Sequence, residues 1–142
     1  MTTPVNGPGL LAAIRARGCD ATDLRDAAHE AHHALTHGIK GKWTRKAVDR
    51  AVQKSWPGRR GYPMRLAEEI DARAVEQIVC ADLGVECWPV DKAVGIMIME
   101  CISVDRVGGL DFDPLVAAVK RRIASPSCRR YADRVIALGA AK

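Results

Sequence analysis

His29, Glu30 and His33 form the pattern HExxH, whose residue types and spacing could hold a zinc ion beside a catalytic base. On an α-helix, residues four apart lie on one face, a single turn from each other. The imidazoles of His29 and His33 could therefore share one Zn²⁺ at about 2.0–2.1 Å. Glu30 adjoins the first ligand and could act as general base toward a water activated by the ion. The pattern indicates metal-dependent hydrolysis if a third protein ligand completes the site.

The third ligand could come from the same helix or from another one. His37 lies one turn beyond His33, but about 12 Å along the helix axis from His29, which is too far for one tetrahedral ion to join all three. Glu69 is the better candidate, because it belongs to a second predicted helix whose small residues allow close packing: Ala67, Ala72 and Ala74. We therefore predict a His29/His33/Glu69 site, with Zn²⁺ as the default ion for this ligand set.

Other residues have supporting roles in this hypothesis. Three of them could orient a ligand or line the pocket: His37, Asp26 and Asp71. Tyr62, just before the second helix, is a candidate to stabilise the oxyanion. His32 points away from the two ligands, and we expect it to be a surface or packing residue. The alternative role for Glu69 is an ion pair with Arg65 or Arg73, one turn away on either side.

The elements that must position these residues are all predicted to be helices. The HExxH helix spans about 23–37, with Asp20 or Thr22 as its cap and Gly38 at its end. Further helices are expected over about 9–17, 44–53, 64–83, 91–104, 114–123 and 126–138. We expect Asp91 to cap the helix that starts there, and its apolar residues to be buried: Ile96, Met97, Ile98, Met99 and Cys101. No strand pattern is present, so the fold class is all-α or nearly so, with residues 1–8 flexible and 9–142 forming a single domain.

The composition favours a globular protein in a reducing compartment. Hydrophobic residues make up 48% of the 142 residues, which is enough for a core. The five cysteines are widely spaced without a CxxC pair, so we expect free thiols. The leading residues lack the apolar core of a signal peptide, and the most apolar run, 93–104, contains Glu100 and is too short to span a membrane. We therefore expect a cytoplasmic protein without a membrane segment.

A basic segment over residues 39–61 raises the possibility of nucleic-acid contact. The net charge of the chain is +5, and this segment has a single acid, Asp49, among many cations. Trp43 and Trp56 could stack on bases while cations bind phosphate, or they could pack in the core beneath a solvated helix, which we favour. If DNA is bound, the candidate residues are Lys40, Lys42, Arg45, Lys46, Arg59 and Arg60.

Two stretches of the second helix carry a resemblance to known families. Glu69-Ile70-Asp71-Ala72 is similar to the ExxA motif that follows HExxH in zinc peptidases of the gluzincin type. Glu68–Ala72 and Ile78–Val85 resemble, more closely, the C-terminal metallopeptidase-like domain of ArdC-type antirestriction proteins of plasmids and phages, over about residues 20–135. The resemblance implies a compact zincin-like helical domain with a His/His/Glu zinc site.

This chain also departs from the families that it resembles. Arg73 stands where the family usually has an acid. The N-terminal single-stranded-DNA-binding domain of those proteins has no counterpart here, and no strand layer is predicted to hold an extended substrate. The first departure concerns the residues that would orient the zinc ligands, the second concerns DNA binding, and the third concerns peptide cleavage.

Three hypotheses follow for the function. The first is a zinc metallopeptidase that acts on a peptide or protein substrate with Glu30 as general base. The second is a non-catalytic, metal-stabilised antirestriction or anti-defence protein, which binds DNA or a host protein through its basic surface. The third is a small helical protein whose histidines bind nothing, and whose melting temperature a chelator would leave unchanged.

Overall fold

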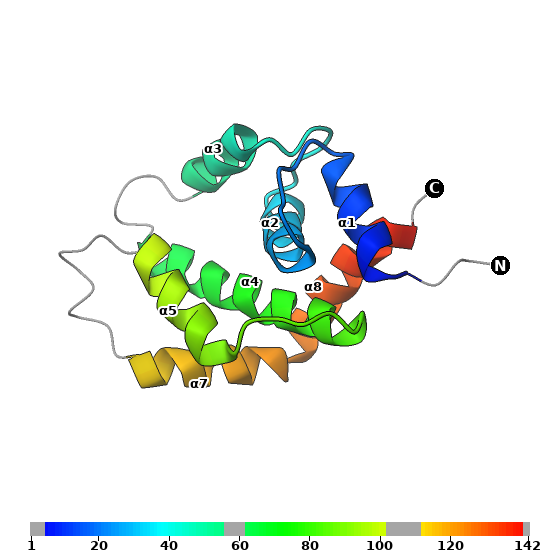
Figure 1. Ribbon diagram of the computed structural model, residues 1–142. Coiled ribbons are helices and arrows are strands. Elements are labelled where there is room, and N and C mark those ends of the chain that lie inside the picture. Colours follow the sequence, from blue (N-terminus) through cyan, green and yellow to red (C-terminus); the bar gives the residue numbers. More distant parts are fainter. Residues whose placement is uncertain (1–4, 56–61, 102–111, 141–142) are drawn as a thin grey trace.

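The computed structural model contains helices and no strands in the part of the chain that it describes, residues 5–55, 62–101 and 112–140 (Figure 1). The side chains of residues 52, 53, 55, 62–65, 100 and 101 are not among those described. The helices are α1 (Gly7–Arg15), α2 (Leu24–Thr36), α3 (Arg45–Ser55), α4 (Tyr62–Asp82), α5 (Val90–Cys101), α7 (Phe112–Ile123) and α8 (Pro126–Ala137), followed by a 3-10 turn (Leu138–Ala140). The all-α prediction is confirmed.

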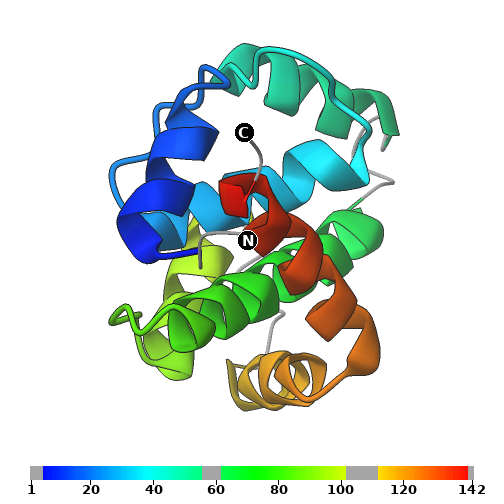
Figure 2. The ribbon, with the colours of Figure 1, turned by 90° about the vertical axis from the view of Figure 1, so that its right-hand side faces the viewer.

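Helix α2, which carries the HExxH pattern, lies at the centre of the molecule. Figures 1 and 2 show it between α3 on one side and α4 on the other, with α1 and α8 beside it. Its alanines are completely buried: Ala27, Ala28, Ala31 and Ala34. They join Leu10, Ile14, Val75, Val79 and Val135 in the main core cluster. Because alanine side chains are short, other helices can pack closely around α2 while its histidines lie at the contact with α4.

Both ends of α2 are fixed by specific hydrogen bonds. Asp23 is the N-cap, and its carboxylate accepts from the amide of Asp26 at 2.8 Å. The carboxylate of Asp26 in turn accepts from the amide of Thr22 at 3.3 Å. At the other end, Gly38 adopts φ +68, and the amide of Ile39 donates to Ala34. The prediction of Asp20 or Thr22 as the cap was wrong, because Asp23 takes the extended conformation directly before the first helical residue.

A second apolar cluster joins α5 to α7 and α4. It consists of Val94, Met97, Ile98, Leu115 and Val119, with Leu66 and Ile70 packed against it. Met99, by contrast, is 80% exposed and Ile96 is half-buried, so the prediction that the apolar residues of α5 are buried holds for Met97 and Ile98 but was wrong for these two. Asp91 is also not the cap of α5. The helix begins at Val90, and the carboxylate of Asp91 accepts from the amide of Lys92 within the first turn.

The remaining boundaries shift by a few residues. Helix α1 begins at Gly7, inside the segment expected to be a flexible lead, because the side chain of Asn6 accepts from the amide of Gly9 and caps it.

The four cysteines with described side chains are free thiols, as expected: Cys19, Cys80, Cys87 and Cys128. The sequence also predicts a loop at 56–61 and an interruption between helices at Gly108-Gly109, and both lie outside the described residues. Among the helices that are described, none combines the length and apolar character needed to cross a bilayer.

Candidate metal centre

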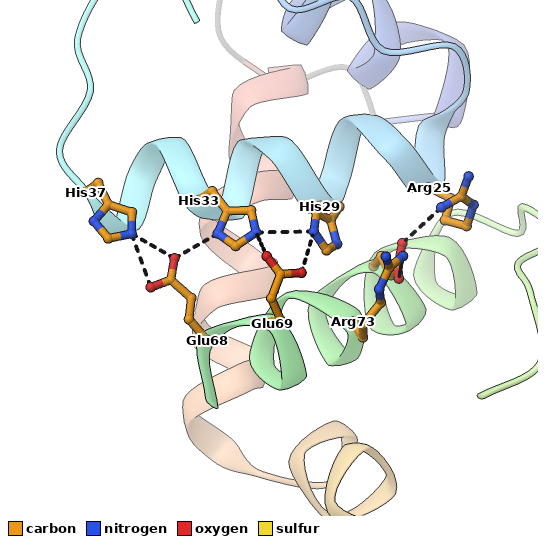
Figure 3. Close-up of polar contacts among 8 residues, drawn as sticks. Arg25, His29, His33, His37, Glu68, Glu69 and Arg73 are labelled. Carbon is orange, nitrogen blue, oxygen red and sulfur yellow. Dashed lines mark hydrogen bonds and ion pairs between the residues drawn. The ribbon is translucent and has the colours of Figure 1, made fainter. Parts of the chain in front are cut away.

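The contact between α2 and α4 brings together the three predicted zinc ligands (Figure 3). The carboxylate of Glu69 faces both histidines. Its Oε2 lies 3.1 Å from Nε2 of His29, and its Oε1 lies 2.8 Å from Nε2 of His33. The two Nε2 atoms are 3.1 Å apart. The prediction that these residues come together is therefore confirmed as a matter of geometry.

The spacing and chemistry of these atoms fit a tetrahedral metal ion. Zinc–ligand distances of about 2.0–2.1 Å place two ligand atoms roughly 3.3 Å apart, close to the separations seen here. The residues are buried, with 7% of His29, 5% of His33 and 8% of Glu69 exposed. Two imidazole nitrogens and a carboxylate are ligands that Zn²⁺ prefers, and only three protein ligands leave a position for water or substrate. The donor set therefore suits a catalytic ion better than a closed structural one.

The electrostatics of the site favour a positive charge between the carboxylates. Burial raises the pKa of Glu69, but the charge of His29 and the hydrogen bonds from both histidines hold it well below its usual value. Burial lowers the pKa of His33, but the hydrogen bonds to Glu68 and Glu69 raise it to about 10. The carboxylates thus stay ionised, and the cluster stabilises a bound cation, whether a proton or a metal ion.

Glu68 was not among the predicted site residues, yet it contacts two histidines. Its Oε1 lies 2.7 Å from Nδ1 of His33 and 2.9 Å from Nε2 of His37. His33, His37 and Glu68 form a second group of donors that could hold an ion. His37 is therefore next to the candidate site, as predicted. The signal in the sequence was the pair of glutamates, because two consecutive helix residues can reach two successive turns of a neighbouring helix.

Glu30 lines a cavity of about 540 Å³ that also contains the three candidate ligands. Burial raises the pKa of its carboxyl group. The lining also includes Asp20 from the loop before α2, Trp43 from the connection between α2 and α3, and Val48 and Asp49 from α3. A cavity of this size could hold a few residues of a peptide. The predicted general base thus lies in a space where substrate could reach the ligands.

The predictions for the neighbouring residues had mixed outcomes. Asp26 lies in the first turn of α2, where its carboxylate accepts from the amide of Thr22, and it also lines the cavity. Asp71 does not orient a ligand histidine, because its carboxylate accepts from Nε of Arg122 at 2.7 Å and from the thiol of Cys128. His32 is a buried packing residue, with its ring 5.2 Å from that of Tyr131. The side chain of Tyr62 lies outside the described part of the chain.

A buried charge cluster continues the cavity wall beyond Glu69. Glu76 is fully buried, and its carboxylate lies 2.9 Å from Nη1 of Arg73 and 3.6 Å from Nη1 of Arg25. The guanidinium of Arg25 stacks on Trp88, 3.4 Å from the ring centroid. Sequence reasoning missed this cluster. It gives Arg73 a partner one turn further along α4.

The basic segment is divided between core and surface. Trp43 is only 1% exposed, and its indole nitrogen donates to the carbonyl of Ile39, so the interpretation as a core residue is confirmed for it. Four of the candidate DNA-binding residues are exposed: Lys40, Lys42, Arg45 and Lys46. Trp56, Arg59 and Arg60 lie outside the described residues.

The comparisons with known proteins do not add a family to this geometry. The chain matches no protein-family model, no curated protein and no solved structure.

Proposed function

We propose that this protein is a zinc-dependent hydrolase that cleaves peptide bonds. The observation that carries the proposal is the convergence of His29, His33 and Glu69 on one point at the wall of a cavity, with Glu30 in the same cavity. The choice of a peptide substrate follows the resemblance to HExxH peptidases with a downstream ExxA motif.

In this mechanism, each residue has a defined task. His29, His33 and Glu69 would hold the ion, which would supply a Lewis acid to activate water and polarise the scissile carbonyl. Glu30 takes a proton from the attacking water and returns it to the leaving amine. The small size of the α2 alanines keeps the two ligand-bearing helices close enough for the three ligands to meet.

The experiment that tests this proposal is a cleavage assay on a mixed peptide library with zinc-loaded protein. The wild type and Glu30→Gln are compared, with the zinc content of both measured beforehand. The proposal predicts cleavage by the wild type and a loss of about 100-fold or more in Glu30→Gln at equal zinc content. Equal cleavage by both proteins, or none by a zinc-loaded wild type, would overturn it.

A second candidate function is a non-catalytic antirestriction or anti-defence role. The exposure of Lys40, Lys42, Arg45 and Lys46 favours it, because cations at the surface can contact phosphates. This candidate predicts DNA binding that weakens steeply with salt, and a Glu30→Gln variant with full biological activity. Salt-independent binding to a protein partner would point instead to a host protein as the target.

A further inference from the structure

The two candidate histidine ligands differ in what lies behind them. Nδ1 of His33 lies 2.7 Å from Oε1 of Glu68, on the side of the ring away from Glu69. Nδ1 of His29 is buried and has no hydrogen-bond partner in the described part of the chain. One histidine is therefore oriented by a carboxylate and the other is not. This asymmetry makes Glu68 a candidate for a specific role at the metal centre.

A carboxylate behind a ligand histidine has a known physical effect. When Nδ1 donates its hydrogen to a carboxylate, Nε2 must carry the lone pair, and the ring is held with that lone pair toward the ion. The carboxylate also makes the imidazole a stronger donor. Removing such a partner costs about 10–100-fold in metal affinity. Glu68 has the geometry for this effect, because its contact to His33 is short and side-chain exposure is 6% for His33 and 9% for Glu68.

Glu68 is itself held from the other side. Nε2 of His37 lies 2.9 Å from Oε1 and 3.1 Å from Oε2 of its carboxylate. Figure 3 shows the resulting row, in which Glu68 lies between His37 and His33, and Glu69 lies between His33 and His29. Two consecutive residues of α4 thus contact His29 and His33 of α2 and His37, the C-cap residue of that helix. The contact with His37 holds the carboxylate of Glu68 in place, and this carboxylate in turn orients His33.

His33, His37 and Glu68 could instead hold a second ion, since their donor atoms also converge. His33 would then have to bind two ions through its two nitrogens, with no hydrogen left on the ring. A neutral imidazole keeps one N–H, and Glu68 is an acceptor at hydrogen-bond distance from it. The geometry therefore favours a hydrogen bond over a second ion.

We propose that Glu68 is a positioning residue, which fixes the tautomer and orientation of His33 for metal binding. The inference rests on the zinc site proposed above. It also gives a reason why Arg73 can replace an acid on α4, because the supporting carboxylate comes from the residue before the ligand Glu69.

The test is the zinc affinity of the full-length chain, measured by competition with a chromogenic chelator. The variants are Glu68→Ala, Glu68→Gln and the matched control Glu86→Ala, whose glutamate is exposed and distant in sequence. Zinc-free melting temperatures identify any variant that fails to fold. The ¹⁵N shifts of the His33 ring report its tautomer in the zinc-loaded proteins. Zinc stoichiometry is measured for the wild type and for His37→Ala.

We expect Glu68→Ala to bind zinc about 10–100-fold more weakly than the wild type. Glu68→Gln keeps an acceptor for the Nδ1 hydrogen and should recover part of this loss, while Glu86→Ala should match the wild type. Unchanged affinity in both Glu68 variants would overturn the inference and leave the zinc site intact. Two zinc ions per wild-type chain, with one lost in His37→Ala, would overturn it as well. A wild type without zinc affinity would instead refute the proposed function.

Discussion

Oε1 of Glu69 lies 2.8 Å from Nε2 of His33, across the contact between α4 and α2. The two residues belong to helices joined by a long connection, so their meeting depends on how closely and in what register these helices pack. The same contact brings His29 to the other oxygen of Glu69. The candidate metal centre therefore depends on the way in which α2 and α4 pack against each other.

Zinc should stabilise the fold, because it binds the folded site and not the unfolded chain. Zinc at about 100 times its Kd adds roughly 2.7 kcal/mol, which raises the melting temperature of a chain this size by about 10 °C. The measurement is thermal unfolding with zinc and then with excess chelator. Glu69→Ala serves as the control and should show no difference between the two conditions. A wild type with the same melting temperature in both would support the hypothesis that the histidines bind nothing.

Asp71 should matter for stability and not for metal. Its carboxylate contacts Arg122 at 2.7 Å, and both side chains are partly exposed, so Asp71→Ala should cost about 1 kcal/mol or less of unfolding free energy. Zinc affinity should stay at the wild-type value. Urea unfolding and chelator competition measure the two effects. A tenfold loss of zinc affinity would restore the role that the sequence first suggested for Asp71.

Glu76 should be one of the most sensitive positions in the chain. Glu76→Gln removes the buried carboxylate that contacts Arg73 and Arg25, and breaking a buried ion pair of this kind costs about 3–5 kcal/mol. Urea unfolding of zinc-free protein measures the change. Glu86→Gln makes the same substitution at an exposed site and should fall within about 0.5 kcal/mol of the wild type. Equal stability of the two variants would show that the cluster contributes little.

The sequence predicted that His29, His33 and Glu69 converge because its signals are local. HExxH fixes two histidines on one helix face, and an acid on a second alanine-bearing helix supplies the third candidate donor without knowledge of the full fold. The all-α class followed in the same way from helical periodicity and from end signals such as Gly38, which adopts φ +68 directly after α2. These features depend on residues close together in the chain.

What the sequence missed depends on how the helices are rotated and covered. Asp71 follows Glu69 by two residues, which is about 200° around a helix, so it faces Arg122 when Glu69 faces α2. Glu68 is only about 100° away and its longer side chain reaches His33. Met99 lies on an all-round apolar helix, and only the packing of α5 on α7 decides that its side is exposed. None of these choices is encoded in a short pattern.

The most direct test of the metal centre is the zinc content of purified, untagged protein by elemental mass spectrometry. The wild type is measured beside His33→Ala and Glu69→Ala, with His32→Ala as the matched control inside the same motif. We predict about one zinc per chain in the wild type and in His32→Ala, and loss of the ion in the other two. A wild type without zinc after reconstitution, or a Glu69→Ala variant that retains it, would contradict the three-ligand site.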